Sequence, residues 1–125
     1  MLQKKILVVD DDVAFIDSIE MFFSSEGFSV VKLINPDNIF DVLEREIPDL
    51  ILLDVYLPKT NGFEILKNLK SHYMFSSIPV IMITADVTVH IDKAFSQGAD
   101  DCIFKPVDPQ ALIKRISKVL HEKII

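Results

Sequence analysis

Apolar and polar residues alternate along this chain in blocks of two kinds. Short, nearly continuous apolar runs rich in β-branched residues are typical of strands buried on both faces of a sheet. Between these runs, apolar residues recur at the spacing of amphipathic helices. The predicted strands are residues 5–9, 28–33, 50–54, 79–85 and 101–106. The predicted helices are residues 13–26, 37–45, 63–72, 87–97 and 109–122.

Residues that start and stop helices stand at several of these boundaries. Gly27 and Gly98 supply C-terminal stops for the first and fourth predicted helices. Asp108 can cap the last helix, with Pro109 at its first position. The helix over residues 87–97 is the weakest of the five, because β-branched residues lower its helix propensity.

Five strands that alternate with five helices define the fold class. We expect an α/β protein with a five-stranded parallel sheet, doubly wound and flavodoxin-like, in a (βα)5 three-layer sandwich. A length of 125 residues suits one hydrophobic core, so residues 1–125 are predicted to form a single domain.

Composition excludes several classes of protein. No apolar run approaches the roughly 20 residues that cross a bilayer, and no signal peptide precedes the first strand, so we expect a cytoplasmic protein with no membrane partner. A net charge of −6 makes the domain a poor binder of nucleic acid. Cys102 is the single cysteine, which rules out an internal disulfide and a thiolate metal site.

Candidate chemistry collects where the predicted strands end. Asp10 and Asp11 follow the first strand, Asp54 ends the third, Thr84 ends the fourth and Lys105 ends the fifth. In an open α/β sheet these ends share one crevice. Carboxylates held close together repel one another unless protons or a cation intervene. Mg²⁺ is the natural cation, because it prefers oxygen ligands.

A carboxylate in such a crevice can also attack phosphorus to form an aspartyl phosphate. Asp54 is the best candidate for this nucleophile because it stands alone at the middle strand. Asp10 and Asp11 form a pair better suited to a metal ion. Lys105 and Thr84 fit as a counter-ion and a hydrogen-bond donor for a phosphoryl group.

These motifs, taken in order, resemble a response-regulator receiver domain of two-component signalling, of the chemotaxis-receiver kind. Each motif is weak by itself, whereas the ordered set spans nearly the whole chain. The matching segments are Ile6–Asp12, Leu52-Leu53-Asp54, Leu57-Pro58, Asn61-Gly62, Ile81–Ala85, Gly98–Asp101 and Lys105-Pro106.

The resemblance implies a phosphorylation switch and not a turnover enzyme. Asp54 would accept a phosphoryl group from the phosphohistidine of a sensor histidine kinase or a histidine phosphotransfer protein. The domain would catalyse only this phosphorylation and the dephosphorylation of Asp54. Asp10, Asp11, Asp54 and the backbone carbonyl of Tyr56 would hold Mg²⁺ as the cofactor.

The resemblance also implies how the signal leaves the site. Lys105 would pair with the phosphoryl oxygens, and Thr84 would move to hydrogen-bond the phosphoryl group. The face formed by residues 87–97, 101–106 and 109–122 would then change. The expected partners are an output domain or protein on that face, with a phosphorylation-dependent homodimer as a further option.

Two positions depart from the usual pattern of that family, and two more flank the expected phosphoryl site. Cys102 stands three residues before Lys105, where receivers usually carry an aromatic ring that turns inward as the threonine moves, so we expect altered switch coupling. Val107 replaces a common phenylalanine and is interpreted as a packing change. Tyr56 and Asp86 flank the phosphoryl site and would control access of water, and a bulky Tyr56 predicts a longer-lived phosphoryl group.

Other functions are weighed against this one. The three aspartates after the first strand also resemble the Asp-x-Asp motif of haloacid-dehalogenase-type phosphatases, but that motif leaves Asp54 without a role. A flavin mononucleotide carrier needs a phosphate loop where these acids would repel phosphate. A degenerate receiver that acts as a phosphorylation-independent interaction module conflicts with the intact set of site residues.

Several residues also have purely structural interpretations. Asp12 is expected to cap the first helix instead of binding metal. Cys102 is interpreted as a small buried hydrophobe and not a redox sensor. The three histidines, at positions 72, 90 and 121, are expected to be solvated. For Ile16, Phe23 and Val89 a core role and an interface role stay equally open.

Overall fold

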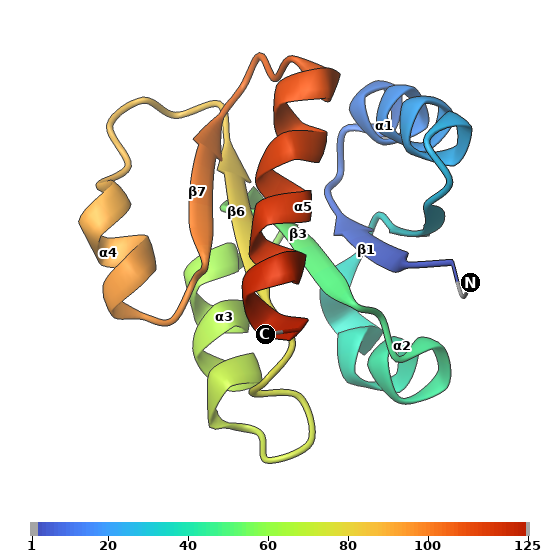
Figure 1. Ribbon diagram of the computed structural model, residues 1–125. Coiled ribbons are helices and arrows are strands. Elements are labelled where there is room, and N and C mark those ends of the chain that lie inside the picture. The colour runs from blue at the N-terminus through green and yellow to red at the C-terminus, as the bar shows by residue number, and fades with distance from the viewer. Residues whose placement is uncertain (1–2, 125) are drawn as a thin grey trace.

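The computed structural model describes residues 3–124, which contain a five-stranded parallel sheet in the order β2-β1-β3-β6-β7 (Figure 1). The chain runs from β1 to one edge, returns to β3, and continues to the other edge. This doubly wound order places helices on both faces of the sheet. The strands are β1 (Lys5–Val9), β2 (Ser29–Leu33), β3 (Leu50–Asp54), β6 (Val80–Thr84) and β7 (Asp101–Phe104).

Two apolar layers hold the helices against the sheet. Ile16 and Phe23 of α1 pack with α5 residues against one face, and Leu66 of α3 and Ala94 of α4 pack with α2 residues against the other. Ile16 and Phe23 are 1% and 0% exposed, which settles their core role. The helices are α1 (Val13–Ser25), α2 (Ile39–Glu46), α3 (Gly62–Ser71), α4 (Ile91–Ser96) and α5 (Pro109–Ile124), with a 3₁₀ helix at Pro36–Asn38 before α2.

Polar side chains cap the N-terminal ends of three helices, α1, α3 and α5. Asp12 Oδ1 accepts the Phe15 N–H at 3.1 Å, which confirms its capping role at α1. Asn61 Oδ1 accepts the Phe63 N–H at 2.8 Å at the start of α3. Asp108 Oδ1 accepts the Gln110 N–H at 3.2 Å. Each cap satisfies a backbone donor that has no partner within the helix.

The prediction of a helix over residues 87–97 is wrong for its first turn. α4 begins only at Ile91. Asp86 Oδ1 accepts both the backbone N–H of Thr88, at 2.9 Å, and its hydroxyl, at 2.6 Å. These local bonds give the backbone an alternative to the helix, and the β-branched residues there favour it.

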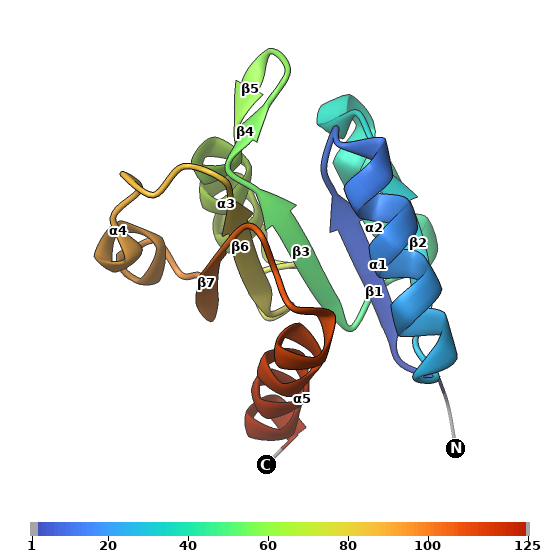
Figure 2. The ribbon, with the colours of Figure 1, turned by 90° about the horizontal axis from the view of Figure 1, so that it is seen from above.

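A small antiparallel hairpin follows β3 and is absent from the predicted elements. It pairs β4 (Tyr56–Leu57) with β5 (Thr60–Asn61). Figure 2 shows this hairpin projecting beyond the end of β3. Strands of two residues carry too short a pattern to be found by periodicity.

The expectation that all three histidines are solvated is wrong for His72. Its ring stacks on Phe75 at 4.6 Å and on Phe40 at 5.4 Å between centroids. His90 and His121 are exposed, as expected.

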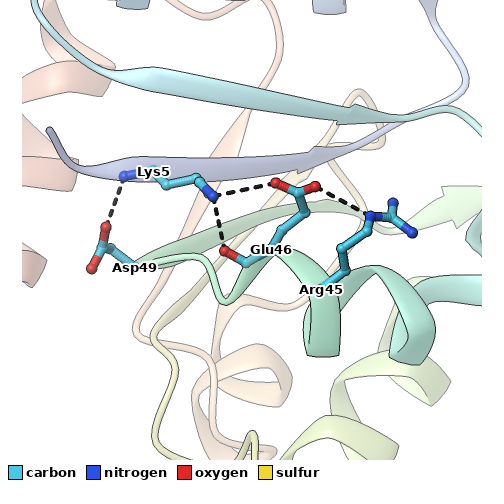
Figure 3. A network of polar contacts seen from close by, with 4 residues as sticks. All are labelled: Lys5, Arg45, Glu46 and Asp49. Carbon is cyan, nitrogen blue, oxygen red and sulfur yellow. Dashed lines mark hydrogen bonds and ion pairs between the residues drawn. The ribbon is translucent and has the colours of Figure 1, made fainter.

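The N-terminal end of the sheet carries a network of opposite charges (Figure 3). Lys5 Nζ lies 3.2 Å from Glu46 Oε1, and Arg45 Nε lies 3.3 Å from Glu46 Oε2. Asp49 Oδ2 accepts the backbone N–H of Lys5 at 2.7 Å, which ties the start of β1 to the start of β3. Among residues 3–124 no helix is long and apolar enough to span a bilayer.

Candidate phosphoryl and metal site

The C-terminal ends of four neighbouring strands converge at one edge of the sheet. Asp10 follows β1, Asp54 ends β3, Thr84 ends β6, and Lys105 follows β7. Within the described part of the chain, Asp10, Asp54 and Thr84 are the buried polar side chains, at 1%, 7% and 0% exposure. Burial of polar groups is costly, so their gathering at one point calls for a function.

Three carboxylates make up the acidic half of this site. Oxygens of Asp10, Asp11 and Asp54 all lie within 4.8 Å of one another. Asp10 and Asp54 are buried, whereas Asp11 faces solvent. The structure thus brings together the three acids that the sequence proposed as metal ligands.

Lys105 partly neutralises this cluster. Its Nζ lies 2.8 Å from Asp10 Oδ2, and the side chains of the pair are 16% and 2% exposed. The other Asp10 oxygen, Oδ1, accepts the Asp12 N–H at 2.9 Å. The same ammonium lies 4.2 Å from the centroid of the Phe15 ring. Lys105 is therefore held over Asp10 and under an aromatic face.

Asp54 is the least compensated of the acids. Burial, reinforced by the negative charge of Asp10, raises the pKa of Asp54 to about 7. Lys105 and the Tyr56 N–H act in the opposite direction but do not offset these effects. Near neutral pH, this carboxylate is poised to gain from an added positive charge.

Thr84 lies at the other side of the site, and among residues 3–124 its hydroxyl serves as a hydrogen-bond acceptor and not as a donor. Thr84 Oγ1 accepts the Asp86 N–H at 3.1 Å, and the Thr84 carbonyl accepts the Lys105 N–H at 2.8 Å. The hydroxyl proton can therefore be offered to another acceptor. Thr84 also connects the ends of β6 and β7.

Tyr56 and Asp86 lie in contact at the mouth of the site. Hydrogen bonding with Asp86 raises the pKa of the exposed Tyr56 phenol. Hydrogen bonds from Thr88, and to a smaller extent the hydrogen bond from Tyr56, lower the pKa of Asp86. This pairing across the loop after β6 could not be read from the sequence. The predicted role of the Tyr56 carbonyl as a ligand stays a prediction.

Gly62 shapes the site through the backbone, a contact that its place in the Asn61-Gly62 motif did not predict. A Cβ built on Gly62 would lie 2.2 Å from the carbonyl oxygen of Asp54. The Gly62 N–H also donates to the Val55 carbonyl at 2.6 Å. The hairpin therefore folds back directly onto the residue bearing the central carboxylate, which only glycine permits.

Cys102 is 3% exposed and packs in the apolar layer between the sheet and α3 and α4. This environment agrees with its interpretation as a small hydrophobe, and burial raises the pKa of its thiol. Phe104 is the register partner of Thr84, so an aromatic residue lies beside the threonine although position 102 carries none. Sequence spacing alone did not single it out.

The residues fit a hard divalent cation. The donors are carboxylate oxygens, which Mg²⁺ prefers, and three acids face a single lysine. The buried, destabilised charge of Asp54 gives the site a reason to bind a cation. Asp10, Asp11 and Asp54 are the residues that would hold it.

Comparison with known proteins identifies the class of protein. The family model for the response regulator receiver domain matches residues 6–117. The chain belongs to this family, whose general function is phosphorylation-dependent signalling. The family resemblance and the α/β fold class predicted from the sequence are both confirmed, and the phosphatase and flavin-carrier alternatives lose their support.

The curated relatives that this chain matches include regulators of about twice its length. The regulatory protein VanRc of Enterococcus gallinarum is 36% identical over 96% of this chain and 51% of its own. The DNA-binding response regulator MtrA of Mycobacterium leprae is 33% identical over 92% of this chain and 50% of its own. This chain therefore spans about half the length of these relatives.

Solved structures show the same architecture. A CheY-like receiver domain protein from Methanospirillum hungatei superposes with a TM-score of 0.86 and is 32% identical, covering 98% of this chain and 97% of its own. A response regulator from Chloroflexus aurantiacus gives a TM-score of 0.88 at 26% identity, with 96% and 99% of the two chains covered.

Proposed function

We propose that Asp54 accepts a phosphoryl group from the phosphohistidine of a sensor histidine kinase or a histidine phosphotransfer protein. The observation that carries this proposal is the buried Asp54 carboxylate within 4.8 Å of Asp10 and Asp11, beside the Lys105 ammonium that pairs with Asp10 at 2.8 Å.

In the transfer, an Asp54 carboxylate oxygen attacks phosphorus as the bond between phosphorus and the donor imidazole nitrogen breaks. The imidazole then takes up a proton, and Asp54 carries an acyl phosphate with about one more negative charge. Bound Mg²⁺ would supply positive charge to the acids and the phosphoryl oxygens. Lys105 would pair with a phosphoryl oxygen, and Thr84 would donate its hydroxyl proton to another.

The response is proposed to leave through α4, β7 and α5. Thr84 and Lys105 are joined by a backbone hydrogen bond, so movement at the site reaches the end of β7 directly. Arg115 of α5 pairs with Asp101 of β7, which couples that strand to the last helix. An output domain or protein, or a second phosphorylated copy, would bind this face.

The kind of output follows from the relatives by analogy. MtrA is described as a DNA-binding response regulator, and a relative in Porphyridium aerugineum as a probable transcriptional regulator. We propose that this domain controls such an output without binding DNA itself. Its net charge of −6 supports that division of labour. A cytoplasmic location and the absence of turnover catalysis belong to the same proposal.

The direct test is incubation with Mg²⁺ and a small phosphodonor, followed by intact-mass measurement. The protein should gain one phosphoryl group, Asp54→Asn should gain none, and Asp49→Asn should behave like the parent chain. Asp49 is the matched control, because it lies beside the starts of β1 and β3, at the opposite end of these strands from Asp10 and Asp54. No mass gain in the parent chain, or a gain retained in Asp54→Asn, would refute the assignment.

The altered switch position has its own test. Cys102→Tyr restores an aromatic residue in this buried position. Chemical-shift changes caused by phosphorylation should then differ on α4 and β7 between the two proteins. Identical changes would mean that Cys102 does not alter coupling.

A further inference from the structure

The Lys105 ammonium contacts two side chains, Asp10 and Phe15. The proposed phosphoryl transfer assigns no role to Phe15. Asp10 Oδ2 lies 2.8 Å from Nζ on one side. The centroid of the Phe15 ring lies 4.2 Å from Nζ on another. An ammonium over the face of a phenyl ring is attracted by the negative charge of that face, most strongly where water is displaced. The Lys105 side chain is only 16% exposed, so this condition is met.

Phe15 is fixed in place by the first turn of α1. Its N–H donates to Asp12 Oδ1 at 3.1 Å, and the Ile16 N–H donates to the Asp12 carbonyl at 3.0 Å. Asp12 in turn donates its own N–H to Asp10 Oδ1 at 2.9 Å. The acid that binds Lys105 and the ring that covers it are thus held in one rigid segment.

The ring of Phe15 gives the Lys105 ammonium a partner other than Asp10. An ammonium supported by Asp10 alone would be bound entirely to an acid that the proposed site needs for a metal ion. An aromatic face attracts the ammonium without using a carboxylate lone pair. It therefore keeps the charge beside the site while leaving it able to turn toward a phosphoryl group on Asp54.

We propose that Phe15 is a positioning residue for Lys105, acting through the face of its ring. This inference rests on the proposed function, in which Lys105 is the counter-ion of the phosphoryl group on Asp54. Phe15 itself touches no reacting atom. Its ring lines an open groove of about 450 Å³ between α1 and the start of α5, so a smaller side chain there opens no closed void.

The test varies the ring face while keeping the shape of the side chain. Phe15→Leu removes the face, Phe15→Tyr keeps it, and 3,4,5-trifluorophenylalanine at position 15 weakens its negative charge at nearly constant volume. With Mg²⁺ and a small phosphodonor, the rate of Asp54 phosphorylation should fall about three- to tenfold in Phe15→Leu and in the fluorinated protein. Phe15→Tyr should restore the rate to within about twofold.

Two controls separate positioning from a general loss of structure. Phe22→Leu changes another half-buried phenylalanine of α1 and should leave the rate unaltered. In a Lys105→Met background, Phe15→Leu should have no additional effect on the rate, since the group it positions is gone.

A readout without metal or phosphodonor completes the test. The protons next to Lys105 Nζ should show an upfield ring-current shift in the NMR spectrum that disappears in Phe15→Leu. The inference is overturned if that shift is missing, if the fluorinated protein reacts at the parent rate, or if the effect of Phe15→Leu persists without Lys105. If the parent protein itself gains no phosphoryl group, the proposed function fails, and the ring-current shift still reports on the Phe15–Lys105 contact.

Discussion

The two ends of the β-sheet differ in their balance of charge: one end is balanced and the other has an excess of acid. At the N-terminal end, Lys5 and Arg45 face Glu46 and Asp49 in a network with equal numbers of each sign (Figure 3). At the C-terminal end, the carboxylates of Asp10, Asp11 and Asp54 face the single ammonium of Lys105.

The consequence is visible in the acids themselves. Hydrogen bonds from Lys5, and then from Arg45, lower the pKa of Glu46. Burial and the charge of Asp10 raise the pKa of Asp54 to about 7. In the balanced network each charge has a partner of opposite sign. An excess of buried acid lacks such partners and lowers the stability of the folded chain. We infer that the first end serves stability and the second serves function.

The largest effect is expected from Gly62, which supports the acidic end through its backbone. Gly62→Ala would place a Cβ only 2.2 Å from the carbonyl oxygen of Asp54, so the hairpin or the end of β3 must move. We expect a loss of about 3–5 kcal/mol in the free energy of unfolding, measured with urea. Gly27→Ala is the control, since an added carbon there meets nothing within 4 Å and any loss comes from the positive φ of 92° at Gly27, which Gly62 does not share. A loss in Gly62→Ala no greater than in Gly27→Ala would contradict this account.

The next effect has the opposite sign and depends on pH. The pKa of Asp54 is about 7 in the folded chain, against an ordinary value of 3.8, so ionising this carboxyl destabilises the fold as pH rises between these values. The cost is complete above pH 7 and disappears below about pH 4. Without divalent ions, Asp54→Asn should therefore stabilise the protein by about 2–4 kcal/mol at pH 8.

This gain should shrink as the pH falls toward 4 in urea-unfolding measurements. Asp49→Asn should bring no gain at pH 8, because its carboxylate already accepts the Lys5 N–H at 2.7 Å. A gain in Asp54→Asn that does not change with pH would argue that packing, and not charge, limits stability at this end.

An intermediate effect is expected at the mouth of the site. Tyr56 is 52% exposed and contacts Asp86, so it can shield a phosphoryl group on Asp54 from water. Tyr56→Asn should speed the decay of phosphorylated Asp54 by about three- to tenfold. Tyr56→Phe keeps the ring and loses only the phenol, so it separates shielding from hydrogen bonding. Unchanged decay in Tyr56→Asn would remove the shielding role.

The smallest effect is expected at the balanced end. Glu46→Gln weakens the ion pairs of Glu46 with Lys5 and Arg45, whose side chains are 33% and 64% exposed. The unfolding midpoint should fall by no more than about 4 °C. Phosphorylation of Asp54 should be unaffected, and a change in its rate would break the separation between the two ends.

Much of the site could be predicted because strand ends are readable in the sequence. The apolar runs located Asp10, Asp54, Thr84 and Lys105, and a parallel sheet then brings their ends to one edge. Contacts made by loops and side chains could not be read in this way. The Tyr56–Asp86 pair and the cover of Phe15 over Lys105 depend on three-dimensional placement.

Local competition also limited the prediction. The first turn of the predicted fourth helix is lost because Asp86 bonds to Thr88, a contact that propensity alone does not reveal. The close approach of Gly62 to Asp54 needs the hairpin, whose strands of two residues are too short to predict. His72 lies in an aromatic cluster assembled from segments distant in sequence.

The most direct test of the contrast between the two ends is the response of thermal unfolding to Mg²⁺ at pH 8. We compare the parent chain, Asp10→Asn at the acidic end and Asp49→Asn at the balanced end. Mg²⁺ should raise the unfolding midpoint of the parent and of Asp49→Asn by the same several degrees, and that of Asp10→Asn by less than half as much. Equal increases in all three proteins, or none in the parent, would contradict the claim that the excess acid forms a cation site.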